Sequence, residues 1–122
     1  MKPVISVVIP LYNKEKSISR TLRSVLAQTE QRFELILVND GSTDASISVV
    51  QTLLGSGKII NQENAGASAA RNRGVYEATT DLIAFLDADD EWYPEFLESI
   101  LMLNKQFPEA DVFGSSYHTR SL

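Results

Sequence analysis

Residues 33–44 read FELILVNDGSTD, and this stretch decides the fold. Its first six residues are a largely apolar run with the length of a buried strand. The polar residues NDGSTD that follow are typical of a turn. Apolar residues then recur at helical spacing over 47–54, until the glycines at 55 and 57 end the pattern. The stretch thus predicts a strand that turns directly into a helix.

The same alternation extends on both sides of this stretch. Before it, an apolar strand over 4–9 stops at Pro10, and a helix follows with Ser17 as its N-cap. After it come a weak strand over 58–61, a helix over 67–78, a strand over 82–86, a helix from Pro94 to about 106, and a last strand over 111–115. Connections of this length predict an α/β domain with three layers, α/β/α, and a mostly parallel sheet.

Length and composition limit the class of protein. At 122 residues, the chain is expected to form a single domain over 1–122, and its 43% hydrophobic content is enough for a core. The net charge of −5 argues against a general nucleic-acid binder, so no nucleic-acid partner is expected. Because the chain has no cysteine, it has neither disulfides nor thiolate metal ligands, which fits a reducing compartment.

Polar segments follow the predicted strands at the edge of the sheet where the carboxyl ends meet. In parallel α/β sheets, ligands bind beyond these ends. The segments are PLYN (10–13), NDG (39–41), QEN (62–64) and DADD (87–90). Their convergence predicts a binding site along one rim of the sheet.

Residues 87–91 read DADDE and place four carboxylates within five residues. Two unit negative charges about 4 Å apart repel by about 4 kcal/mol at an effective dielectric of 20, so such a cluster favours a bound cation. Oxygen ligands favour Mg²⁺ or Mn²⁺, with Asp87 and Asp89 as the candidate ligands and a diphosphate as a natural partner. The alternative is that these acids are solvated or stabilise the start of the helix at Pro94. For Glu91 we favour this alternative.

Three further side chains follow the first two strands. Asp40 could accept a hydrogen bond from a base N–H or a ribose hydroxyl, or it could serve the turn and cap the next helix, a duty that we assign to Asp44. Tyr12 could stack on a base or belong to the core, and Glu15 could hold a ribose. We expect Gly41 to supply the backbone freedom of the turn.

Residues 64–74 read NAGASAARNRG, in which a small residue recurs every fourth position. This gives one helix face almost without side chains, and we expect Gly66, Ala70 and Gly74 to pack closely against the sheet. The start of this helix could also approach phosphates, with Arg71 as their counter-charge one turn later.

Other sequence signatures are absent or incomplete. The chain has no P-loop, no Gly-x-Gly-x-x-Gly dinucleotide motif and no nucleophile elbow. A phospho-acceptor receiver domain has a similar size, but it needs an acidic pair after the first strand, where this chain has Pro10, Leu11 and Tyr12.

Four stretches together resemble family-2 glycosyltransferases of the GT-A fold. They are VVIPLYNKE (7–15), LVNDGSTD (37–44), NAGASAARNRG (64–74) and FLDADD (85–90). The resemblance implies a Rossmann-like domain that binds a nucleotide-diphospho-sugar, with a UDP-sugar favoured, and a divalent metal, Mn²⁺ or Mg²⁺. It further implies inverting transfer of the sugar to a saccharide or lipid-linked acceptor, as in polysaccharide biosynthesis. The alternative is a non-catalytic nucleotide-sugar-binding module.

The resemblance also implies roles for particular residues. Four residues would line the nucleoside pocket, with Asp40 facing the base: Pro10, Tyr12, Glu15 and Asp40. Arg71 would lie beside the nucleotide-sugar. Asp87 and Asp89 would form the Asp-x-Asp motif, with Asp89 as the principal metal ligand.

In this family the catalytic base follows the Asp-x-Asp motif at a distance, and nothing in residues 91–122 matches its motif. We therefore expect no catalytic base in this chain. We expect the domain to be truncated before the acceptor-binding half, so that the chain alone transfers little or no sugar. An apolar edge or face uncovered by the truncation would invite self-association. We expect a cytoplasmic location, with the inner face of the membrane as an alternative for the full-length protein.

Overall fold

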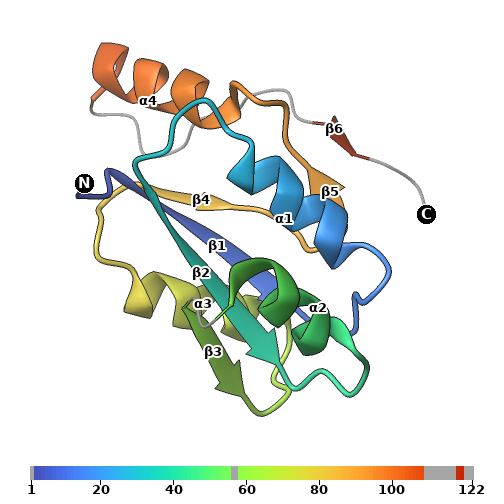
Figure 1. Ribbon diagram of the computed structural model, residues 1–122. Helices are drawn as coiled ribbons and strands as arrows, with labels where there is room; N and C mark the ends of the chain where they lie inside the picture. The colour runs from blue at the N-terminus through green and yellow to red at the C-terminus, as the bar shows by residue number, and fades with distance from the viewer. Residues whose placement is uncertain (1, 56–57, 109–117, 120–122) are drawn as a thin grey trace.

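A parallel sheet of four strands, in the order β3-β2-β1-β4, forms the centre of the computed structural model (Figure 1). The structure describes residues 2–55, 58–108 and 118–119. The four strands are β1 (Ile5–Leu11), β2 (Phe33–Asp40), β3 (Ile59–Gln62) and β4 (Ile83–Phe85). All three pairings within the sheet are parallel.

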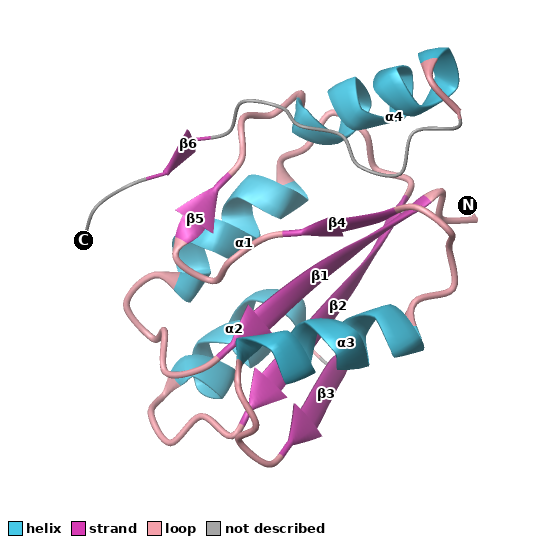
Figure 2. Ribbon diagram, turned by 180° about the vertical axis from the view of Figure 1, so that it is seen from behind, coloured by secondary structure: helices cyan, strands magenta, loops and turns pink. Residues whose placement is uncertain are grey.

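Helices cover both faces of this sheet. They are α1 (Ile18–Leu26), α2 (Ser46–Leu54), α3 (Ala67–Glu77) and α4 (Phe96–Gln106). Figure 1 shows α1 and α2 in front of the sheet, and Figure 2, seen from behind, shows α3 across the opposite face. The predicted three-layer α/β/α architecture with a parallel sheet is confirmed.

Alternation of side chains along β1 explains the two layers of helices. Ile5, Val7 and Ile9 belong to the larger core cluster, which they share with apolar residues of α1, α2 and α4. Val8 points to the other face and joins a second cluster with Ala70 of α3. Because both faces of β1 are buried, the strand is an almost continuous apolar run.

The predicted end of the first strand is wrong, because β1 continues through Pro10 to Leu11. The carbonyl of Val8 accepts a hydrogen bond from the N–H of Leu86. Every second residue of β1, including Val8 and Pro10, therefore directs its backbone groups toward β4. Within the described residues β4 ends opposite Val8, and the nitrogen of Pro10 therefore points past its end. The missing N–H leaves no ladder bond unmade, and Pro10 keeps its pairing with Val38.

Two predicted helix starts also differ from the structure. Ser17 precedes α1 as predicted, but its hydroxyl donates to the carbonyl of Ala88 rather than to the helix. Pro94 was expected as a first helical residue, whereas α4 begins at Phe96 and ends at Gln106. A two-residue strand, β5 (Asp90–Glu91), was not predicted; it pairs with β6 (His118–Thr119) in an antiparallel manner. The predicted strand over 111–115 lies outside the described residues.

The small-residue face of α3 packs against β1, with one exception. A Cβ on Gly74 would lie 2.2 Å from Cγ1 of Val8, and Ala70 is fully buried, so close packing is confirmed for these two residues. For Gly66 the prediction is wrong. It is exposed, a Cβ there would meet open space, and its φ of +101° is a backbone conformation that favours glycine.

In the ranges that the structure describes, none of the helices has the length and apolar character needed to cross a membrane.

Candidate functional site

A pocket of about 390 Å³ lies at the carboxyl ends of the strands, against the start of α3. The end of β2 and the segments after β1, β3 and β4 all contribute to its lining. Six of the seven predicted site residues line it: Pro10, Tyr12, Asp40, Arg71, Asp87 and Asp89. Glu15 is exposed and is not among the described lining residues.

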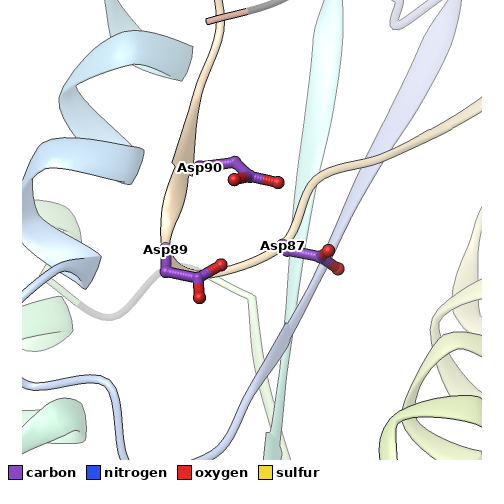
Figure 3. A group of neighbouring side chains, drawn as sticks. All are labelled: Asp87, Asp89 and Asp90. Atoms are coloured by element: carbon purple, nitrogen blue, oxygen red, sulfur yellow. The ribbon is translucent and has the colours of Figure 1, made fainter. Parts of the chain in front are cut away.

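Three carboxylates meet beside this pocket. Asp87, Asp89 and Asp90 each offer an oxygen atom, and these oxygens lie within 4.8 Å of one another. In Figure 3 the side chains of Asp89 and Asp90 point to the same side of the turn, and that of Asp87 points toward α3. A group of carboxylate oxygens is the donor set that Mg²⁺ and Mn²⁺ prefer, so these residues fit such an ion.

The turn that carries these carboxylates is folded back on itself. The N–H of Asp90 donates to the carbonyl of Asp87 at 3.1 Å, and the preceding N–H of Leu86 donates to Val8 in β1 at 3.0 Å. Between them, the side chain of Ala88 is 2% exposed and belongs to the core. Asp87 and Asp89, on either side of Ala88, both line the pocket.

Two cations lie next to the carboxylates. Nη2 of Arg71 is 3.1 Å from Oδ1 of Asp87, and Nζ of Lys14 is 3.7 Å from Oδ2 of Asp89. All four side chains are about half exposed, so each pair stabilises the fold by about 1 kcal/mol at most. Sequence reasoning singled out Arg71 but missed Lys14, although it lies within the stretch VVIPLYNKE.

The carboxylate of Asp40 lies at the opposite side of the pocket and is 3% exposed. Its Oδ1 accepts from Nε2 of Gln62 at 2.9 Å and from the N–H of Ala65 at 2.8 Å. Its Oδ2 accepts from the N–H of Gly66 at 2.9 Å, with Nδ2 of Asn64 at 3.4 Å. Asp40 therefore holds the segment that leads into α3. Its predicted contact with a base stays a prediction.

These hydrogen bonds also set the charge state of Asp40. Burial acts to raise the pKa of this carboxyl, but the bonds from Gln62, Ala65 and Gly66 together outweigh it and lower the pKa below the ordinary value. Asp40 is thus an anion at neutral pH. The sequence alone could not identify Gln62 and Asn64 as hydrogen-bond donors to Asp40. Their side chains come close to Asp40 because β2 pairs with β3.

Asn13 ties the segment after β1 to the turn after β2. Its Oδ1 accepts from the N–H of Thr43 at 2.8 Å, and its own N–H donates to Oγ of Ser42 at 3.0 Å. Its φ of +49° is unusual for a residue other than glycine, and these bonds hold it there. This attachment fixes the segment that carries Tyr12 and Lys14.

The turn after β2 behaves as expected. Gly41 has a φ of +78°, and a Cβ on it would lie 2.9 Å from the backbone nitrogen of Asn64, so a glycine is required there. Oδ1 of Asp44 accepts from the N–H of Ser46 at 2.9 Å, so Asp44 serves the turn as predicted. The predicted N-cap role is wrong, because Ala45 holds the N-cap position of α2. Oδ2 of Asp44 accepts from the N–H of Glu15 at 3.2 Å.

Two alternatives are decided by exposure and contacts. Tyr12 is 46% exposed and lines the pocket, so it is not a core residue. Glu91 is not solvated as the favoured alternative predicts: its side chain is 15% exposed and forms an ion pair of 2.6 Å with Arg20 of α1. A larger hollow of about 730 Å³ lies between α1 and residues 91–94, and Glu91 is the acidic residue in its described lining.

Comparison with known proteins decides the family. The family model described as "Glycosyl transferase family 2" matches residues 6–121. The chain belongs to glycosyl transferase family 2. It is 42% identical over 118 residues to the glycosyltransferase alr2836 of Nostoc sp. strain PCC 7120, a match that covers 93% of this chain and 36% of that protein. The chain thus spans about a third of the length of this relative.

Two solved proteins share the fold of this chain. TarS of S. aureus superimposes with a TM-score of 0.77 and 29% identity, over 87% of this chain and 33% of that one. TarS has also been solved with UDP and with UDP-GlcNAc. The mannosyltransferase PcManGT of Pyrobaculum calidifontis, solved with GDP-Man and Mn²⁺, has a TM-score of 0.72 and 23% identity, over 85% of this chain and 33% of that one. The chain therefore has the GT-A fold over this region.

Proposed function

We propose that this chain binds a nucleotide-diphospho-sugar, with a UDP-sugar favoured, together with Mn²⁺ or Mg²⁺. The observation that carries the proposal is the single pocket in which Asp87 and Asp89 meet Arg71, Tyr12 and Asp40 in a family-2 chain. The complexes of TarS with UDP and UDP-GlcNAc support the nucleotide.

Each residue contributes a different interaction in this proposal. The ring of Tyr12, exposed at the pocket, offers a face on which a base can stack. Asp87 and Asp89 would hold the ion, and Asp90 lies within reach of the same position. Arg71 would exchange its exposed pairing with Asp87 for a diphosphate oxygen.

The reaction that we propose for the whole protein is inverting transfer of the sugar to a saccharide or lipid-linked acceptor. A divalent ion in this position would stabilise the negative charge that develops on the departing nucleoside diphosphate. We propose that the catalytic base and the acceptor site belong to a following half of the protein. The cytoplasmic location stays a prediction.

Calorimetric titration tests donor binding. UDP, UDP-GlcNAc and GDP-mannose are titrated into the chain in Mn²⁺ and in EDTA, and UDP is expected to bind more tightly in Mn²⁺ than in EDTA, because the ion binds both carboxylates and phosphates. In D89N this dependence on Mn²⁺ should be lost. D81N removes an exposed acid outside the pocket lining and is the control. Equal binding in Mn²⁺ and EDTA by the wild type would contradict the proposed metal site.

A sugar-transfer assay addresses the catalytic part separately. We expect the 122-residue chain to bind the donor without transferring its sugar to an acceptor. Robust, metal-dependent transfer by this chain would contradict the absence of a catalytic base in it.

A further inference from the structure

The carbonyl group of Ala88, at the middle of the acidic turn, is held by two side chains of distant sequence position. Oγ of Ser17 and Oγ1 of Thr21 both donate to this oxygen, each at 3.0 Å. Ser17 is 1% exposed, Thr21 is fully buried and Ala88 is 2% exposed. Water therefore has little access to this group of three residues.

The buried carbonyl of Ala88 accepts two hydrogen bonds, although one would be enough to satisfy it. A carbonyl oxygen accepts two hydrogen bonds, so the pair of hydroxyls saturates it. Ser17 and Thr21 lie one helical turn apart, and their side chains thus reach the same atom from the same face at the start of α1. The result is a fixed attachment of α1 to the residue between Asp87 and Asp89.

We propose that Ser17 and Thr21 are positioning residues for the metal site, an inference that rests on the proposed function. Their hydroxyls fix the peptide group between Ala88 and Asp89, at the centre of the acidic turn, so Asp87 and Asp89 are held facing the pocket before an ion arrives. The residues that orient metal ligands commonly affect affinity strongly although they do not touch the metal. Neither hydroxyl touches the ion in this arrangement.

The segment before α1 strengthens this attachment. Lys14, three residues before Ser17, forms the ion pair with Asp89. The N–H of Ser17 in turn donates to the carbonyl of Lys14 at 3.1 Å. The same short segment therefore contacts the turn both at its backbone and at one of its carboxylates.

The experiment compares Mn²⁺ binding, measured from the electron paramagnetic resonance of free Mn²⁺, among folded variants of the 122-residue chain. S17A/T21V removes both donors, whereas S17A/T21S retains one. S6A is the matched control, because Ser6 is a fully buried residue whose hydroxyl bonds to Glu34 and Thr80 outside the pocket lining. Circular dichroism gives the melting temperature of each variant.

We expect S17A/T21V to raise the Kd for Mn²⁺ by about tenfold, at the lower end of the effect of removing partners of metal ligands. S17A/T21S should bind close to the wild type, and S6A should keep wild-type affinity even where its melting temperature falls. If S17A/T21V does not fold, S17A and T21V singly are each expected to show a smaller loss in the same direction.

Two results would overturn the inference alone: wild-type affinity in folded S17A/T21V, or an equal loss in S6A. If S17A/T21V does not fold, unchanged affinity in both single variants has the same consequence. If the wild type binds no Mn²⁺ even with UDP present, the proposed function fails instead, and this inference fails with it.

Discussion

At the scale of residues, Asp40 ends β2 and Asp89 lies four residues after β4, and their carboxylates have opposite surroundings. Asp40 is buried and receives hydrogen bonds from three residues of the segment before α3. Asp89 is partly exposed and faces Lys14 and two other acids. The first carboxylate is committed to the fold, and the second is available to a cation.

Replacing Asp40 by asparagine should destabilise the chain. An amide offers one oxygen in place of two, so at least one of the donors on Gln62, Ala65 and Gly66 loses its acceptor. We expect D40N to lower the free energy of unfolding by about 1–3 kcal/mol, measured by urea denaturation at pH 7. A variant as stable as the wild type would show that these bonds contribute nothing net.

The lowered pKa of Asp40 gives this contribution a pH dependence with a definite sign. The folded state holds the proton less tightly than the unfolded state, so the stabilisation is fully present above the unfolded pKa and is lost as pH falls through the folded pKa. The difference in stability between wild type and D40N should therefore shrink below about pH 4. Urea denaturation from pH 7 to pH 3 measures it, and a difference that stays constant would exclude this linkage.

At the scale of elements, the position of α3 depends on the lack of a side chain at Gly74. Alanine is a better helix former than glycine by about 1 kcal/mol, but here its Cβ would lie 2.2 Å from Val8. We expect G74A to destabilise the chain by about 1–3 kcal/mol, because the sheet or the helix must shift. In a V8A background the same substitution should cost less, and a thermodynamic cycle of the four proteins measures the difference. A stabilising G74A would mean that α3 is free to move outward.

Most elements could be predicted from periodicity, and the errors have identifiable causes. The end of β1 at Pro10 depends on where β4 stops, which is a property of the neighbouring strand. Ser17 is a residue type that commonly caps a helix, but its hydroxyl donates to the carbonyl of Ala88, 71 residues away in the sequence. Gly66 fits the small-residue spacing of α3, but it does not pack against the sheet. It lies just before the helix and has a positive φ angle that favours glycine.

At the scale of the whole molecule, the site could be predicted as a set of strand ends but not as a set of contacts. The parallel sheet brings four segments to one edge, and this rule accounts for five of the six predicted residues that line the pocket. The sixth, Arg71, comes from α3. The same rule says nothing of side-chain direction. Sequence reasoning therefore missed three residues that bind other parts of the site: Lys14, Asn13 and Gln62. It also expected Glu15 in the pocket, and Glu15 is not among the described lining residues.

The predicted self-association of the 122-residue chain can be tested on its exposed apolar side chains. Phe85 lies in β4, an edge strand of the described sheet, and is 46% exposed. An exposed apolar strand edge favours pairing with a second copy. We expect the mean mass in sedimentation equilibrium to rise with concentration, and F85K to reduce the rise. A strictly monomeric wild type at high concentration would contradict the prediction.

The most direct measurement of the central claim is anomalous diffraction at the manganese edge from crystals of this chain grown with Mn²⁺ and UDP. We predict a peak about 2 Å from carboxylate oxygens of Asp89 and Asp87, with the diphosphate beside Arg71. A peak remote from these acids, or UDP bound in the hollow between α1 and residues 91–94, would contradict the account.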